Sequence, residues 1–166
     1  MEKYTADFFM KRAIELANEA AKQGEVPVGA VIVANGEIIA EAHNSREQSQ
    51  NATGHAEIIA INKACNKLGS WRLSGCTLYV TLEPCPMCAG AIINSRIDSI
   101  VYGAKDEKAG CCGSVVNLFA MPFNHRPVIT QGICEEECQK LMSDFFISIR
   151  NKKNNENYAD NCEKQI

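Results

Sequence analysis

The sequence contains no apolar run that approaches the roughly 20 residues of a membrane-spanning helix. It starts with Met1-Glu2-Lys3-Tyr4, which lacks the basic segment and apolar stretch of a secretory signal. We therefore expect a protein without membrane spans that resides in the cytoplasm.

The chain also has no excess of positive charge. Its 17 Lys and Arg residues are outnumbered by 20 Asp and Glu residues, which gives a net charge of -3. A protein that binds nucleic acid mainly through a broad basic surface has the opposite balance. Any RNA would therefore be bound through a local patch and a shaped pocket.

No internal repeat divides the chain. Its 166 residues, 46% of them hydrophobic, suit one globular domain. We place this domain at residues 1–150 and expect the polar, Asn-rich segment 151–166 to be a disordered tail. The nine cysteines are an odd number, and two have metal-type spacing, which favours a reducing compartment over a disulfide scaffold.

Two short motifs carry the chemistry: His55-Ala56-Glu57 and Pro84-Cys85-Pro86-Met87-Cys88. One histidine and two cysteines make three zinc ligands, whereas a structural zinc site nearly always has four. The open position can hold a water that the metal polarises, so that the water loses a proton near neutral pH. Glu57 is our candidate for the proton carrier, which takes that proton and passes it to the substrate.

The local sequence places both motifs at the starts of helices. The first helix begins near Thr53 or Gly54 and ends near Gly69. The second follows Pro84, with both cysteines in its first turn, where the positive helix end favours the thiolate that binds metal. The histidine and the glutamate are two residues apart, so they converge on one cavity only because they lie at a helix end.

Other interpretations of these residues stay open at this point. Cys85 and Cys88 form a C-x-x-C that can be a redox pair. Cys111 or Cys112 could supply the fourth ligand of a structural zinc site. A catalytically silent, zinc-stabilised RNA-binding subunit should lack the proton carrier, and Glu57 is present.

The remaining segments predict an α/β fold. Apolar residues at helical spacing indicate helices over residues 4–22 and 135–150. Asn35-Gly36 favours a type I′ turn between the first two strands, and a strand–helix–strand crossover later in the chain implies a parallel pair. We therefore expect a mixed sheet of about five strands with helices on its faces. The expected strands are 28–33, 37–40, 76–81, 99–102 and 128–130.

The motifs lie within longer runs that resemble the bacterial tRNA-specific adenosine deaminases over about residues 5–150. These runs are 24–30, 71–73, 78–91, 102–106, 124–126 and 143–146. H-x-E followed by P-C-x-x-C is the signature of zinc nucleobase deaminases. The resemblance implies a cytidine deaminase-like three-layer α/β/α sandwich, a homodimer with one zinc ion per subunit, and hydrolysis of the wobble adenosine in a tRNA anticodon loop to inosine and ammonia.

The resemblance also implies a role for individual residues. The zinc ligands would be His55, Cys85 and Cys88, and the proton carrier would be Glu57. Asn44 matches a position that hydrogen-bonds the purine, while the backbones of Ala56 and Pro84 match groups that hold the reacting edge of the base. The wall around the splayed anticodon nucleotides would consist of Val26, Pro27, Val28, Asp106, Asn124 and Phe146.

Deamination of a free base or nucleotide is the alternative enzymatic function. Deaminases of guanine, cytosine and deoxycytidylate use the same zinc chemistry, so the two motifs do not separate them from a tRNA deaminase. An RNA substrate is physically reasonable, because a loop nucleotide is already unstacked and costs less to bring into a pocket than a paired base.

Overall fold

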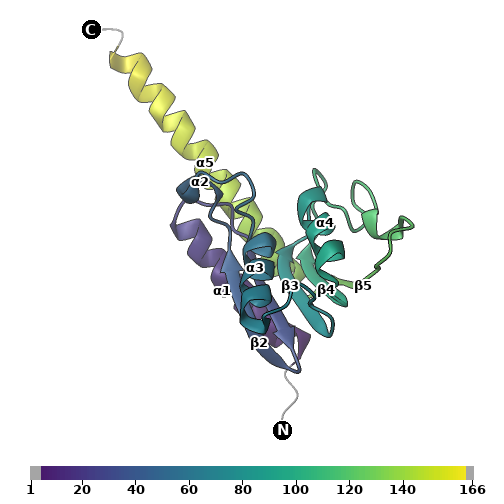
Figure 1. The fold of residues 1–166 in the computed structure, drawn as a ribbon. Coiled ribbons are helices and arrows are strands. Elements are labelled where there is room, and N and C mark those ends of the chain that lie inside the picture. The colour runs from purple at the N-terminus through teal and green to yellow at the C-terminus, as the bar shows by residue number, and fades with distance from the viewer. Residues whose placement is uncertain (1–4, 164–166) are drawn as a thin grey trace.

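The fold is built on a five-stranded sheet with helices on both faces (Figure 1). The computed structural model describes residues 5–163, and the side chains of residues 5–154. The helices are α1 (Ala6–Lys22), α2 (Arg46–Ser49), α3 (Ala56–Leu68), α4 (Pro86–Ser95) and α5 (Glu135–Glu163), with the 3-10 helix η1 at Leu118–Ala120. The strands are β1 (Gly29–Ala34), β2 (Glu37–His43), β3 (Cys76–Leu82), β4 (Ser99–Ala104) and β5 (Val128–Gln131).

The sheet is mixed, as the sequence predicts. Its strand order is β2-β1-β3-β4-β5. β1 pairs antiparallel with β2 and with β3, whereas β3, β4 and β5 run parallel to one another. The predicted three-layer α/β arrangement is thereby confirmed, including the short fifth strand.

Local signals in the sequence set the ends of these elements. Asn35 and Gly36 have φ angles of 53° and 80°, which are the two positive values that a type I′ turn requires between β1 and β2. Thr5 caps α1 by accepting a hydrogen bond from the Phe8 N–H. Gly69 ends α3 in the left-handed conformation, with a φ of 61°.

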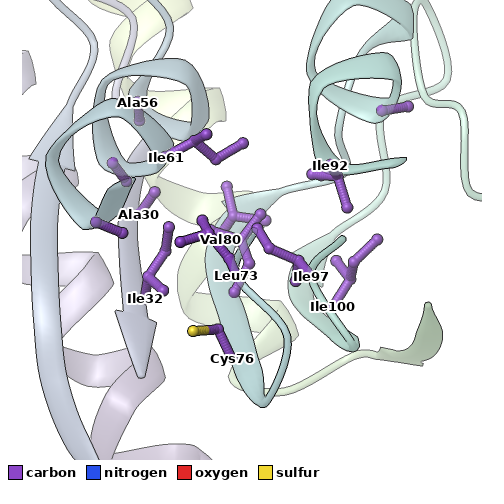
Figure 2. Packing of buried hydrophobic residues seen from close by; sticks show 14 of the residues in the cluster. Ala30, Ile32, Ala56, Ile61, Leu73, Cys76, Val80, Ile92, Ile97 and Ile100 are labelled. Carbon is purple, nitrogen blue, oxygen red and sulfur yellow. The ribbon is translucent and has the colours of Figure 1, made fainter. Parts of the chain in front are cut away.

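β1 contributes to the core on both faces of the sheet, because successive side chains of a strand point to opposite faces. Ala30 and Ile32 belong to the apolar cluster beneath α3 and α4. Figure 2 shows these two residues packing below Ile61 of α3, with Ile92 of α4 farther along the same cluster. The alternate residues of β1 pack with α1 on the other face.

α1 and α5 cover the second face of the sheet. Met10 and Ala13 of α1 form one buried cluster with Val101 and Ala104 of β4 and with Cys138 of α5. The C-terminal helix is therefore anchored through its first turn to β4 and α1. Within the described part of the chain, every helix is too short or too polar to cross a membrane.

α5 is longer than the sequence analysis expected. The predicted helix ended at Arg150, and residues 151–166 were expected to be disordered, but α5 continues to Glu163. Residues 151–163 contain no glycine or proline, the two residue types that most readily end a helix. Figure 1 shows this part of α5 extending beyond the sheet and the other helices. The rest of the expected tail, residues 164–166, lies outside the described residues.

We predict that Gly29→Ala destabilises the protein, because β1 passes very close to α1 at this position. A Cβ on Gly29 would overlap the carbonyl oxygen of Ala13 and lie 2.7 Å from the backbone nitrogen of Ala17. Backbone atoms cannot rotate away, so α1 would have to shift at a cost of about 1–3 kcal/mol or more. Urea denaturation measures this loss of unfolding free energy. Gly90→Ala in α4 is the matched control, since its Cβ would meet nothing within 4 Å, and an equal loss in both variants would contradict the prediction.

Candidate active site

Three metal-ligating side chains meet where two helices begin. His55 is the N-cap of α3 and Cys85 is the N-cap of α4, while Cys88 lies in the first turn of α4. The Nδ1 atom of His55 is 3.6 Å from the Sγ atom of Cys85 and 3.6 Å from the Sγ atom of Cys88. All three ligand atoms lie within 4.8 Å of one another. The helix starts thus bring together the ligands that the motif spacing predicts.

The geometry of this group fits a zinc ion. Tetrahedral zinc with a Zn–N distance of about 2.1 Å and a Zn–S distance of about 2.3 Å separates nitrogen from sulfur by about 3.6 Å. Both nitrogen–sulfur distances have this value. Among the residues whose side chains are described, neither Cys111 nor Cys112 belongs to the group. The arrangement therefore favours a three-ligand site over a closed structural site with four ligands.

The two thiols have opposite pKa shifts. The side-chain hydrogen bond between Cys88 and Cys85, together with His55, lowers the pKa of Cys85 to about 4. The same contact and burial raise the pKa of Cys88. The Cys85 thiolate in turn raises the pKa of His55. Since zinc binds thiolates, metal binding would displace the proton that Cys88 holds.

Glu57 lies beside this group in the first turn of α3, and only 4% of its surface is exposed. Burial raises the pKa of Glu57 to about 7, with a smaller contribution from the negative charge of Cys85. A carboxyl group with this pKa is present in both protonation states near neutral pH, as a residue that accepts and then donates a proton requires. The backbone of His55 is extended, with φ -81° and ψ 146°. This N-cap conformation allows His55 and Glu57 to line the same cavity.

A cavity of about 710 Å³ opens above the metal group. Its wall combines the segment before β1, the segment after β2, the starts of α3 and α4, the ends of β3 and β4, and one face of α5. Eight of the residues singled out from the sequence line it: Val26, Val28, Asn44, His55, Glu57, Cys85, Asp106 and Phe146. Cys88 is fully buried behind them.

Asn44 is oriented by the start of α3. Its Oδ1 atom accepts a hydrogen bond of 2.9 Å from the Ala56 N–H. Because this contact requires the oxygen on that side, the amide nitrogen of Asn44 is the atom left for another partner. Asn44 therefore offers hydrogen-bond donors to a ligand in the cavity.

Besides Cys88, four of the predicted site residues do not line the cavity: Pro27, Ala56, Pro84 and Asn124. The Ala56 N–H is already bonded to Asn44, and the Pro84 carbonyl accepts a hydrogen bond of 2.9 Å from the Cys111 N–H. A carbonyl oxygen has a second lone pair, so Pro84 can still accept from a ligand. Asn124 is exposed on the surface.

The cavity rim also contains charged residues that the sequence analysis did not identify. Arg46 lies on one side, and Lys105 and Lys108 lie on the other. Glu47 and Glu107 alternate with them, so the rim as a whole is not strongly basic. The two lysines lie in the loop after the strand 99–102, where a site is expected, but only the folded chain brings Arg46 to the same opening.

We predict that the protein binds about one zinc ion per chain and that Cys88→Ala abolishes this binding, because two ligands hold zinc far more weakly than three. Elemental analysis of the purified protein measures the metal content. Cys76→Ala and Cys111→Ala are the controls, since both cysteines are buried but lie outside the metal group. Loss of zinc from Cys111→Ala would contradict a three-ligand site.

Comparison with known proteins shows that the chain is similar to deaminases. A model of the MafB19-like deaminase family matches residues 5–150. The tRNA-specific adenosine deaminase of Bacillus subtilis (strain 168) is 53% identical over 148 residues, which cover 89% of this chain and 92% of that protein. The matched residues of the family model include the metal group, Glu57 and every cavity residue named above.

Two solved structures resemble the fold closely. One comes from studies of A-to-I editing by tRNA:A34 deaminases at the wobble position of transfer RNA, and it has a TM-score of 0.79, an identity of 44%, and coverage of 80% of this chain and 97% of that chain. The other is a guanine deaminase from Bacillus subtilis, with a TM-score of 0.62, an identity of 40%, and coverage of 76% and 83%. Both are structures of deaminases, the first from work on tRNA and the second a guanine deaminase.

Proposed function

Because the chain belongs to the tRNA-specific adenosine deaminase family, we propose that it converts the wobble adenosine of a tRNA anticodon loop to inosine and ammonia. The observation that carries this proposal is the buried Glu57 beside the group of His55, Cys85 and Cys88, at the base of an open cavity. Such a cavity admits a base that remains attached to a polymer.

Zinc is the metal we propose, with one ion per subunit held by His55, Cys85 and Cys88. When bound there, zinc supplies a Lewis acid that lowers the pKa of a water molecule toward neutrality. The two thiolates and the imidazole are the ligands that zinc prefers, and the observed nitrogen–sulfur distances fit it. The chain itself supplies the remaining steps of the reaction.

Glu57 manages the protons of the hydrolysis. Its carboxylate takes a proton from the attacking water while the C6–O bond forms, and it donates this proton to N1 of the adenine ring. It then transfers the second proton of the water to the amino group, the C6–N bond breaks, and ammonia leaves. One water is consumed, and one inosine and one ammonia are formed. The pKa of Glu57 near 7 suits both transfers at neutral pH.

The cavity wall orients the base for this attack. The amide nitrogen of Asn44, whose oxygen is bonded to Ala56, donates to an acceptor on the purine ring. Val26 and Val28 supply the apolar part of the wall. Phe146 is 43% exposed at the mouth, where its ring can stack on a neighbouring base.

The shape and the local charges of the rim support RNA binding. Arg46, Lys105 and Lys108 can each contact a phosphate, although the whole chain has a net charge of -3. Asp106 completes the wall on the same side as the two lysines. Pro27 and Asn124 lie outside the cavity. We therefore propose that Pro27 supports the cavity wall and that Asn124 contacts nucleotides farther along the anticodon loop.

We further propose a homodimer that acts in the cytoplasm, with the deaminase domain at residues 1–150. Exposed apolar side chains in the segment after β4 support a second subunit, which would remove them from water. They are Val115, Val116, Met121, Phe123 and Val128. The cysteines whose side chains are described are free thiols, as expected in a reducing compartment.

The direct test incubates the zinc-loaded protein with a tRNA that has adenosine at the wobble position. We expect inosine at that position and no ammonia from free guanine, cytosine or deoxycytidylate. A tRNA with guanosine at the wobble position is the control. Deamination of free guanine without inosine formation would contradict the proposal. It would favour the alternative function, deamination of a free base, which is also the activity of the similar guanine deaminase structure.

Glu57→Ala tests the proton transfers. We expect it to lower the rate of inosine formation by at least about 100-fold, because a positioned acid–base group contributes roughly that much or more. Zinc content and affinity for an anticodon stem-loop should stay at wild-type values. Glu47→Ala is the control, because Glu47 is an acidic residue of the same cavity that is exposed at the rim. Substantial activity in Glu57→Ala would remove the mechanism.

A further inference from the structure

Glu83 is a buried acid whose partners are neither a cation nor the metal group. It lies between the end of β3 and Cys85, and only 2% of its surface is exposed. Its Oε1 atom accepts hydrogen bonds from the backbone N–H groups of Cys112 at 2.8 Å and Ser114 at 3.1 Å. Its Oε2 atom accepts from the Asp106 N–H at 3.0 Å and from the Ser114 hydroxyl.

These hydrogen bonds satisfy both oxygens of the buried carboxylate. No ion pair with Glu83 occurs among residues 5–154. Backbone donors from one loop therefore provide the charge compensation that a buried carboxylate requires.

The donors come from both ends of the segment 105–114, which we call the rim loop. Two further backbone contacts close it: the Gly110 N–H donates to the Asp106 carbonyl at 2.8 Å, and the Cys111 N–H donates to the Pro84 carbonyl at 2.9 Å. A Cβ on Gly110 would overlap the carboxylate group of Glu83. The rim loop is therefore wrapped around this single side chain.

The rim loop forms one side of the cavity through Lys105, Asp106 and Lys108. We propose that Glu83 is a positioning residue, whose buried carboxylate holds the rim loop in the shape that binds the nucleotides around the reacting base. It takes no part in metal binding or in proton transfer. The expected effect on KM rests on the proposed function, whereas the expected effect on the structure of the rim loop does not depend on the substrate.

Two substitutions disturb this contact by different routes. Glu83→Gln removes the charge and replaces one acceptor oxygen with an NH₂ group, which faces N–H donors that can no longer be satisfied. Gly110→Ala leaves the carboxylate chemically intact, but its Cβ would overlap both that group and the Asp106 carbonyl oxygen, so the rim loop has to shift. Gly90→Ala, which adds the same methyl group where nothing lies within 4 Å, is the matched control.

We expect both variants to retain one zinc ion per chain. Amide hydrogen exchange at Asp106, Cys112 and Ser114 should become faster by about tenfold or more, while the exchange of core amides stays unchanged. The KM for a tRNA with a wobble adenosine should rise by about tenfold, with kcat changed by less than about threefold, because binding contacts and not chemistry are lost. Gly90→Ala should match the wild type in every measurement.

The split between KM and kcat separates positioning from a merely structural role. A fold that is only less stable contains fewer active molecules, which lowers the apparent kcat and leaves KM unchanged. That result, or wild-type KM in both variants well below their melting temperatures, would overturn the proposal. If Glu83→Gln does not fold, the amide exchange rates, KM and kcat of Gly110→Ala and Ser114→Ala test the proposal instead.

The proposed function and this inference can fail separately. If the wild-type protein does not deaminate tRNA, the proposed function fails, and the exchange rates still test whether Glu83 holds the rim loop. If the wild type is active and the exchange rates of both variants are unchanged, the inference about Glu83 fails alone.

Discussion

The site depends on two helices that begin side by side at one edge of the sheet. His55 and Cys85 have the same structural position, the N-cap, in α3 and α4. An N-cap residue has an extended backbone, so its side chain is not confined to the helix surface. This freedom lets His55 face the two sulfurs while Glu57, two residues later, reaches the same cavity. The positive helix ends also favour the thiolates that bind metal.

Two buried acids near this edge have opposite electrostatics because their hydrogen-bond partners differ. Burial dominates for Glu57 and raises its pKa. Hydrogen bonds dominate for Glu83 and lower its pKa. Glu25, on the other side of the cavity, is 1% exposed and accepts hydrogen bonds from the backbone N–H groups of Glu47 and Gln48. The acid without a set of backbone donors is therefore the one suited to move protons.

Features that depend on neighbouring residues could be predicted from the sequence, whereas features that depend on distant contacts could not. Asn35-Gly36 specifies its turn through backbone sterics alone, and the spacing of Cys85 and Cys88 specifies one helical turn. Arg46 reaches the cavity only through the folded chain. The helical continuation of residues 151–163 was missed because polar composition suggested disorder, although no residue in that stretch breaks a helix.

The active site is assembled from parts that leave the ribosome at different times. Every metal ligand precedes residue 89, but the cavity wall also needs Met142 and Phe146 of the last helix. The residues of the candidate metal site are therefore synthesised well before the cavity wall is complete, and the wall closes only when α5 packs on the sheet.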